Sequence, residues 1–179
     1  CKTGLSNEDS SGGVCERCGA QVEQSEKEQW MLRMSDYAQD LIDGLDDTEF
    51  QEKTKLAQIN WIGKSTGAEV DFKVKEIDES LTVYTTRPDT LYGVTFMVMA
   101  PEHPLIDKYQ DKINNMDEVI AYREKANKKT ELERTQLNKE KTGVRLDGFT
   151  GINPITEKEI PIYISDYVMM GYGTGAIMA

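Results

Sequence analysis

Apolar positions follow two different periods along this chain, and the period changes at Ala68. Before Ala68, apolar residues recur every three or four positions, as on one face of an α-helix. This spacing predicts an amphipathic helix over 26–45 and a shorter one over 48–60, with Leu56 and Ile59 directed inward. We expect the face of the first helix to be core; it comprises Trp30, Met34, Tyr37, Leu41 and Leu45, widened by Met31, Ala38 and Ile42.

From Ala68 onward, apolar and polar residues alternate, which is typical of half-exposed strands. Glycines at 63 and 67 mark a hinge between the two patterns. Strands are predicted at 70–74, 81–84, 94–100, 144–148, 160–165 and 176–179, and two or three helical segments across 102–140. The strand at 94–100 is nearly all apolar, so we expect both of its faces to be buried. The mixture predicts an α+β fold.

Composition narrows the function classes. The 179 residues carry a net charge of -11, which argues against tight binding to a nucleic-acid backbone. Residues 108–143 are the exception, with 9 Lys and Arg against 7 Asp and Glu. We therefore expect a nucleic acid to touch the chain only through this segment, which we take to be its tip. No apolar run reaches the length of a membrane span and no secretory signal opens the chain, so we expect a cytoplasmic protein without a membrane partner.

Three cysteines lie near the start of the chain, and Cys15 and Cys18 form a Cys-x-x-Cys pair followed by Gly19. Such a turn directs two thiolates at one ion, so Cys1, Cys15 and Cys18 are candidate ligands of a structural zinc ion. A closed zinc site needs four ligands, and the only histidine, His103, is distant in sequence. An acidic arm with uncoordinated thiols is the alternative.

The densest cluster of polar chemistry is the run from Thr85 to Gly93, Thr-Thr-Arg-Pro-Asp-Thr-Leu-Tyr-Gly. It follows an alternating strand and contains a turn-forming proline, so we expect a tight turn that gathers hydroxyls, a guanidinium and a carboxylate. Polar groups at the mouth of a buried strand are typical of a small-molecule pocket. Thr85, Thr86, Arg87, Asp89 and Thr90 are therefore candidate site residues.

Motifs along the whole chain resemble, in the same order, those of leucyl-tRNA synthetase of the bacterial type, over its editing domain. They are the cysteine pair, Gln29-Trp30, Trp61-Ile62-Gly63, the threonine run, Glu102-His103-Pro104-Leu105, Lys141-Thr142-Gly143, and Gly173-Thr174-Gly175-Ala176 with Met178. Asp89, the His103–Leu105 turn and Met178 favour the leucyl type over the related valyl and isoleucyl editing domains. The resemblance implies a barrel-like sheet with peripheral helices over 62–179, a helical linker over 25–61 and a partial zinc ribbon over 1–24.

The resemblance also implies an activity: hydrolysis of tRNA(Leu) mischarged with isoleucyl, norvalyl or methionyl groups, with no cofactor needed for editing. The full-length enzyme would be a monomer that joins leucine to tRNA with ATP. Neither His-x-Gly-His nor Lys-Met-Ser-Lys-Ser is present here, so we expect no amino-acid activation by this chain. In the family an ammonium-binding aspartate follows the last motif, so we expect a fragment truncated at both ends that is inactive or weak alone.

The residues divide the expected chemistry between them. No Ser-His-Asp set is present, so we expect the hydroxyls of Thr85 and Thr86 to position a water and the ester carbonyl. The resemblance implies that Thr90 blocks leucine sterically, and that Tyr172 and Met178 line the adenosine and acyl sides of the pocket. Arg87 can bind a phosphate or pair with Asp89.

Other interpretations stand beside these. Threonine-rich strands are good strands without any site, Arg87-Pro88-Asp89 is also typical of a salt-bridged turn, and Tyr172 and Met178 suit a core. His103, before a proline, is predicted to start a helix or turn. The alternative functions are a non-catalytic module that binds the tRNA end, and a valyl- or isoleucyl-type editing domain.

Overall fold

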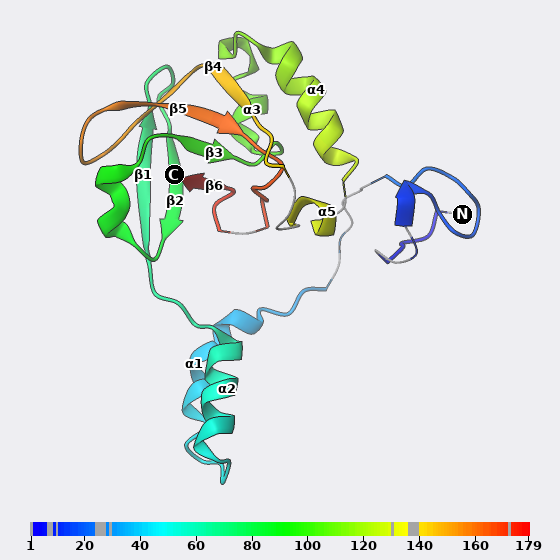
Figure 1. The fold of residues 1–179 in the computed structure, drawn as a ribbon, viewed down its shortest axis with the longest axis vertical. Helices are drawn as coiled ribbons and strands as arrows, with labels where there is room; N and C mark the ends of the chain where they lie inside the picture. Colours follow the sequence, from blue (N-terminus) through cyan, green and yellow to red (C-terminus); the bar gives the residue numbers. More distant parts are fainter. Residues whose placement is uncertain are drawn as a thin grey trace. The chain divides into compact units, whose positions relative to one another are not determined.

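The computed structural model describes residues 2–6, 9, 11–23, 28, 30–129, 131–135, 140–171 and 173–179 (Figure 1). The contacts within the chain divide it into two units, Glu26–Gly67 and the remainder, Cys1–Ser25 with Ala68–Ala179. We call the first the helical unit and the part from Ala68 onward the barrel unit. The boundaries predicted at 24 and 61 stay predictions.

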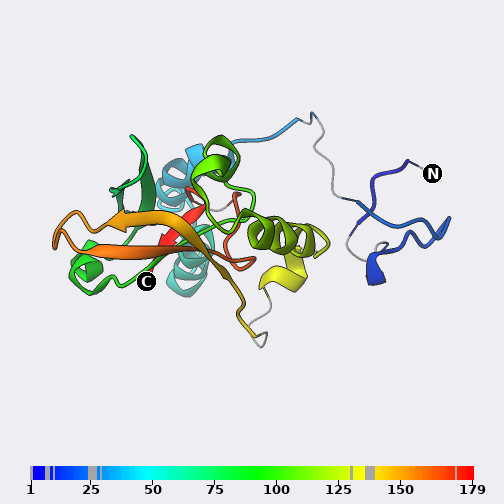
Figure 2. The same ribbon diagram turned by 90° about the horizontal axis from the view of Figure 1, so that it is seen from above.

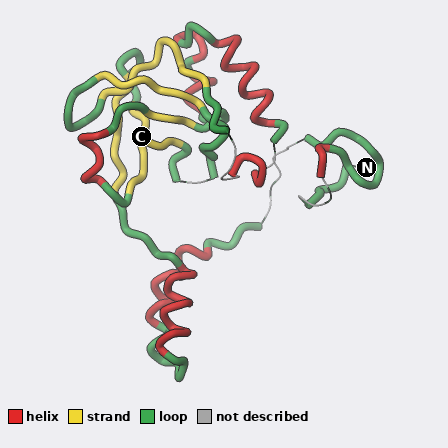
Figure 3. Tube along the Cα trace, viewed as in Figure 1, coloured by secondary structure: helices red, strands yellow, loops and turns green. Residues whose placement is uncertain are grey.

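The helical unit consists of short helices (red in Figure 3). They are the 3₁₀ turn η2 (Met34–Tyr37), α1 (Ala38–Asp43) and α2 (Glu52–Ile62). α2 ends at Gly63, which has a left-handed φ of 61° and donates its N–H to the Ile59 carbonyl. A glycine takes this helix-ending conformation without the cost that a Cβ would add. The hinge predicted here is thus a helix C-cap followed by an irregular segment, 64–67.

Three predictions about the helical unit are wrong in whole or in part. The helix expected over 26–45 is confirmed only from Met34 to Asp43, since residues 28, 30–33 and 44–45 are not helical; residues 26, 27 and 29 lie outside the described residues. Its apolar face is not core either, because Trp30 is 102% exposed and only Leu45 of the predicted face is buried. Leu56 and Ile59 are likewise exposed. The short helices α1 and α2 thus leave most of these apolar side chains uncovered.

Six strands form one sheet in the order β2-β1-β4-β5-β3-β6. Their bounds are β1 Ala68–Val74, β2 Ser80–Thr85, β3 Met97–Met99, β4 Val144–Ile152, β5 Glu159–Ile164 and β6 Ala176–Met178. All neighbours are antiparallel except β3 and β5, which run parallel. The outer strands β2 and β6 also lie against each other, so the sheet nearly closes. The predicted α+β fold with a barrel-like sheet is confirmed.

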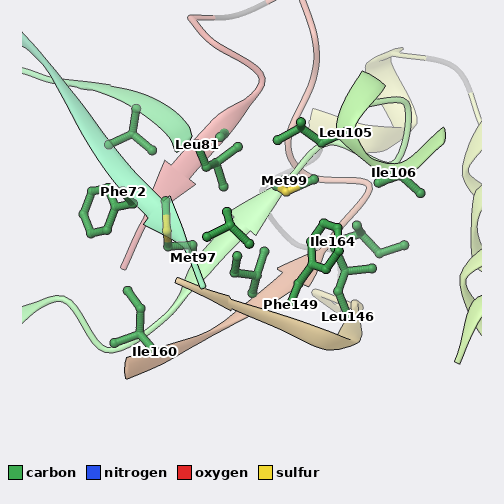
Figure 4. Packing of buried hydrophobic residues seen from close by; sticks show 14 of the residues in the cluster. Phe72, Leu81, Met97, Met99, Leu105, Ile106, Leu146, Phe149, Ile160 and Ile164 are labelled. Carbon is green, nitrogen blue, oxygen red and sulfur yellow. The ribbon is translucent and has the colours of Figure 1, made fainter. Parts of the chain in front are cut away.

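The core fills the inside of this sheet (Figure 4). The alternation that predicts β1 is also what places its side chains: Phe72 and Val74 are buried, whereas Asp71 and Lys73, which alternate with them, are exposed. Strands from opposite sides contribute the largest buried side chains, among them Leu81, Met97, Met99, Leu146, Phe149, Ile162 and Ile164. The nearly closed sheet therefore places inward residues of different strands against one another.

β4 is longer than the predicted strand 144–148, and it bends in the middle. Its pairing with β5 (side by side in Figure 2) shifts register between Arg145 and Thr150. Gly148 lies in this bulge with a φ of 101°, and a Cβ there would collide with the Lys112 carbonyl oxygen. Such a close backbone approach requires glycine.

Short helices connect β3 to β4. They are α3 (Pro104–Lys108), η4 (Gln110–Lys112), α4 (Met116–Asn127) and α5 (Glu131–Thr135), which agrees with the segments predicted across 102–140. The strand predicted at 94–100 is shorter, because only Met97–Met99 is regular; Thr95 and Phe96 are exposed. Among the described residues no helix has both the length and the apolar character needed to cross a membrane.

Candidate functional site

The threonine run forms a compact turn at the end of β2. Thr85 is the last residue of that strand, and the 3₁₀ helix η3 (Pro88–Gly93) follows. Pro88 occupies the first helical position, where its fixed φ suits the helix and its missing N–H costs nothing. The tight turn expected here is therefore a short helix. We call residues 85–93 the threonine turn.

Two threonine hydroxyls hold the threonine turn together. The Arg87 N–H donates to the Thr85 Oγ1 at 3.0 Å, and the Thr90 Oγ1 donates to the Arg87 carbonyl at 2.7 Å. Because Thr85 Oγ1 accepts in this contact, its own O–H remains able to donate to another group. The Thr86 side chain is exposed and makes no hydrogen bond within the described part of the chain. Thr85 and Thr86 thus present hydroxyls with unused capacity.

Arg87 and Asp89 form a two-pronged ion pair on the outside of the turn. Arg87 Nε lies 2.9 Å from Asp89 Oδ1, and Nη2 lies 2.7 Å from Oδ2. The hydrogen bond from Arg87 lowers the pKa of Asp89, and the same contact raises the pKa of Arg87. Of the two uses predicted for Arg87, pairing is the one that the structure contains. Both side chains are exposed, so the pair adds little stability.

Met178 lies in β6, beside the end of the threonine turn. It pairs in register with Met97, and the neighbouring Ala179 exchanges hydrogen bonds with Phe96, three residues after Gly93. Its side chain is partly buried and packs against the core. Tyr172, predicted on the adenosine side, lies outside the described residues. β2, which leads into the threonine turn, and β6 are the two edge strands, and they meet where the sheet nearly closes.

His103 caps a helix, as the sequence predicts. Its Nδ1 accepts the Leu105 N–H at 3.3 Å at the start of α3. Burial lowers the pKa of His103, because a charged imidazole would be desolvated there. This cap gives His103 a structural use, and its side chain makes no hydrogen bond to the threonine turn among the described residues.

Asn153 is a residue that the sequence analysis missed. It is fully buried, and its Nδ2 donates to the Leu91 carbonyl of η3 at 2.8 Å. Its Oδ1 accepts two N–H groups of the turn after β4, from Ile155 at 2.9 Å and Thr156 at 3.1 Å. An asparagine before a proline is typical of a local turn. Nothing in the sequence alone indicates the long-range bond to Leu91.

The cysteine pair forms a tight loop inside a small hairpin. The Gly19 N–H donates to the Cys15 carbonyl and the Cys15 N–H to the Ala20 carbonyl, both at 2.8 Å, while Val14 and Gln21 pair across the hairpin. A hydrogen bond with the Ala20 backbone and another with the Cys15 side chain lower the pKa of Cys18. Thiolates form more readily at such a site, and zinc binds thiolates.

Only part of the predicted metal site, Cys15 and Cys18, lies within the described residues. Cys1 lies outside the described residues, and no group of three or more possible metal ligands exists among those that are described. The loop geometry suits a two-thiolate half of a zinc site. The remaining ligands of such a site stay a prediction.

Comparison with known proteins gives a consistent result. Residues 59–179 match the sequence model of a family described as leucyl-tRNA synthetase, editing domain. The whole chain is 56% identical to a leucine–tRNA ligase of Alkaliphilus oremlandii, 47% to one of Clostridium tetani and 50% to one of Elusimicrobium minutum. The chain spans about a fifth of the length of these relatives (22%, 22% and 21%).

A solved structure is similar over nearly the same extent. It is the ternary LeuRS–tRNA–LeuAMS complex of Agrobacterium radiobacter K84, with 34% identity and a TM-score of 0.68. The similarity covers 98% of this chain and 21% of that one. It extends across the barrel unit and most of the rest of the chain.

Proposed function

The chain belongs to the leucyl-tRNA synthetase editing-domain family, and on that premise we propose that it hydrolyses mischarged tRNA(Leu). Its substrates are tRNA acceptor ends carrying isoleucyl, norvalyl or methionyl esters. The observation that carries the proposal is the threonine turn, which presents two hydroxyls with unused hydrogen-bonding capacity at the end of β2. The full-length enzyme would bind ATP, ligate leucine, and act as a cytoplasmic monomer.

A second site is needed because leucine differs from its competitors only in its apolar side chain. One methylene is worth about 1–3 kcal/mol in a pocket, or roughly 10–200-fold in discrimination. Hydrolysis of the wrong ester after transfer adds a second selection to the first. The editing site must therefore accept several apolar acyl groups and reject leucine.

The chemistry assigned to Thr85 and Thr86 is placement rather than covalent attack. An unassisted threonine hydroxyl is a weak nucleophile, and the described part of the threonine turn offers neither a histidine nor a cysteine as a partner. The two hydroxyls instead orient a water and donate to the carbonyl oxygen as its negative charge grows. The adjacent ribose hydroxyl of the tRNA can assist the proton transfer.

Thr90 is the residue proposed to exclude leucine. The hydrogen bond from its Oγ1 to the Arg87 carbonyl fixes χ1, and so fixes the direction of its methyl group. A fixed β-branched side chain is a rigid obstacle to a γ-branched substrate. Met178 supplies apolar surface for the acyl group, Tyr172 contacts the adenosine, and the Arg87–Asp89 pair binds charged groups of the substrate at the rim.

Two variants separate the methyl of Thr90 from its hydroxyl. Thr90→Ser keeps the hydrogen bond and removes the methyl, whereas Thr90→Val keeps both branches and removes the hydrogen bond. We expect Thr90→Ser and Thr90→Ala to hydrolyse correctly charged leucyl-tRNA(Leu) at least about tenfold faster than the unmodified protein. Thr90→Val keeps the obstacle, so it should leave the leucyl ester intact; if Thr90→Ser and Thr90→Ala leave it intact as well, Thr90 is not the gate.

Zinc is proposed as a structural ion held by Cys1, Cys15 and Cys18 with a ligand from another segment. It takes no part in editing, so removing it with a chelator should leave the rate of deacylation unchanged while loosening the hairpin around Cys15. Loss of deacylation that follows zinc removal alone would contradict this assignment.

The decisive test of the function uses this chain in a complete enzyme. We would replace the matching segment of the Alkaliphilus oremlandii ligase, which is 56% identical, with these 179 residues, and call the product the chimera. The chimera should hydrolyse isoleucyl-tRNA(Leu) at least about tenfold faster than the leucyl ester. Hydrolysis of neither ester, with the tRNA end still bound, would favour a non-catalytic binding module; hydrolysis of mischarged tRNA(Val) instead would favour the valyl type.

A further inference from the structure

We propose that Asn153 is a positioning residue for the editing site, fixing the threonine turn against the body of the barrel unit. The inference rests on the proposed function for its catalytic consequence, although its structural part stands alone. Asn153 does not touch the substrate in this account. It acts through the Leu91 carbonyl, to which its Nδ2 donates at 2.8 Å.

The threonine turn has few other attachments. The hydrogen bonds made by residues 86–93 join partners within the threonine turn or Val94 just after it, and the bond from Asn153 is the one exception among the described residues. Apart from this bond and the pairing of Thr85 with β1, the turn is tied down by its apolar side chains, of which Leu91 is buried in the core. Arg87, Asp89, Thr90 and Tyr92 are exposed. Leu91 is thus fixed at two points: its carbonyl accepts the hydrogen bond from Asn153, and its side chain packs in the core.

The other end of Asn153 is equally fixed. Its Oδ1 accepts the N–H groups of Ile155 and Thr156, and its backbone N–H donates to the Lys158 carbonyl at 3.0 Å. The side chain is fully buried and every polar atom has a partner. A buried amide satisfied at both ends behaves as a rigid link, because breaking either bond leaves a buried polar atom unpaired.

This link connects the β4–β5 connection to the residue that follows Thr90. Thr90 is held on its other side by the Arg87 carbonyl, at 2.7 Å from its Oγ1. The position of the Thr90 methyl is therefore set by two hydrogen bonds in series, one of them from Asn153. A displacement of about 1 Å at a reacting site can cost on the order of 100-fold in rate, so the link bears on chemistry as well as on folding.

The variant that tests this is Asn153→Asp. It keeps the shape and the Oδ1 acceptor, and it replaces the donor to Leu91 with an oxygen that repels the Leu91 carbonyl. The matched control is Asn115→Asp. Asn115 makes the same kinds of contact outside the threonine turn and at a less buried position, from its Nδ2 to the Arg145 carbonyl at 2.8 Å and from the Asp147 N–H to its Oδ1 at 3.0 Å.

The first measurement is amide hydrogen exchange in the 179-residue chain, which needs no activity. We expect Asn153→Asp to raise the exchange rate of the Thr90 and Val94 N–H groups by about tenfold or more relative to the remaining barrel amides, and Asn115→Asp to leave that ratio unchanged. Equal exchange of these two amides in Asn153→Asp and the unmodified chain would overturn the proposal.

The second measurement is deacylation by the chimera at saturating and limiting substrate. In Asn153→Asp we expect kcat for the isoleucyl ester to fall about tenfold or more with KM changed less than about threefold, and the isoleucyl-to-leucyl rate ratio to fall. Asn115→Asp should leave kcat, KM and the isoleucyl-to-leucyl rate ratio unchanged. If the unmodified chimera cleaves isoleucyl-tRNA(Leu) and Asn153→Asp matches it in rate and selectivity, the positioning role is wrong although the function holds. If the unmodified chimera cleaves neither ester, the proposed function fails, and hydrogen exchange alone decides the structural link.

Discussion

The helical unit and the barrel unit treat their apolar residues in opposite ways. In the barrel unit, residues predicted to face inward, such as Phe72 and Met97, are 0% exposed. In the helical unit, Trp30 and Trp61 are 102% and 91% exposed, although the sequence pattern of the region is equally clear. Periodicity identifies which face of an element is apolar. It does not say whether the partner for that face lies in the same chain.

The two secondary-structure types explain the difference. A strand pairs with its neighbours through the backbone, so a nearly closed sheet automatically places inward side chains opposite one another. A helix satisfies its own backbone and needs a separate surface for its apolar face. Sequence periodicity therefore predicts burial more accurately for the strands of one nearly closed sheet than for two short helices.

The largest expected effect comes from emptying the barrel core. Phe72→Ala should lower the free energy of unfolding by about 3–5 kcal/mol, because the closed sheet cannot collapse around the cavity. Trp61→Ala in the helical unit should change it by no more than about 0.5 kcal/mol. Urea unfolding followed by far-ultraviolet circular dichroism measures both. A large loss for Trp61→Ala would mean that the exposed face is structurally covered.

Glycine substitutions sharpen the same comparison. Gly148→Ala should cost about 3 kcal/mol, since a φ of 101° is strained for alanine and its Cβ would collide with the Lys112 carbonyl. Gly63→Ala, at the C-cap of α2, has a φ of 61° and no contact nearer than 3.7 Å, so about 1 kcal/mol is expected. Thermal unfolding of the two variants should rank them in this order, and the reverse ranking would contradict the bulge geometry.

A buried ion pair gives the third effect. Arg134 is buried, lies 2.8 Å from Glu102 through its Nη1, and donates to the carbonyls of Asp166 and Val168. Arg134→Met should destabilise the barrel unit by about 2 kcal/mol, because these acceptors lose a charged donor. Lys64→Met removes an exposed contact with Gln39 in the helical unit and should have no measurable effect on urea unfolding. An equal loss of unfolding free energy in the two variants would contradict the expected difference between a buried and an exposed contact.

The smallest effect concerns pH. The pKa of His103 in the folded protein is below its ordinary value of 6.5, so the unfolded chain binds a proton more strongly. Stability should therefore begin to fall as the pH drops below about 6.5, and stop falling below the folded pKa. His103→Asn keeps a helix-capping side chain that does not titrate, and should remove this slope. Urea midpoints between pH 7 and pH 5 test it; an unchanged slope would assign it to other groups.

Local patterns predicted most of the barrel unit. The alternation through Val70, Phe72 and Val74, the strand before Thr85 and the glycine-rich entry to Ala176 each correspond to a strand of the sheet. The helix start at His103 was also predictable, because an N-cap and a following proline are both local signals.

What could not be predicted depends on contacts distant in sequence. The bulge at Gly148 is set by the Lys112 carbonyl, and the bond from Asn153 to Leu91 joins residues 62 positions apart. The threonine run was expected to be a tight turn, but the Thr90 hydroxyl closes a 3₁₀ helix on the Arg87 carbonyl instead. Such pairings leave no periodic trace in the sequence.

The central claim is that hydrolysis takes place at the threonine turn. The most direct test is single-turnover deacylation of isoleucyl-tRNA(Leu) by the chimera carrying Thr86→Val, beside Thr82→Val as the matched change in the preceding strand, β2. Thr82 donates its hydroxyl to Asp71 and lies before the turn. We predict a loss of about 100-fold for Thr86→Val, the effect of removing one oxyanion donor, and a normal rate for Thr82→Val. A normal rate for Thr86→Val, or an equal loss for both variants, would contradict the account.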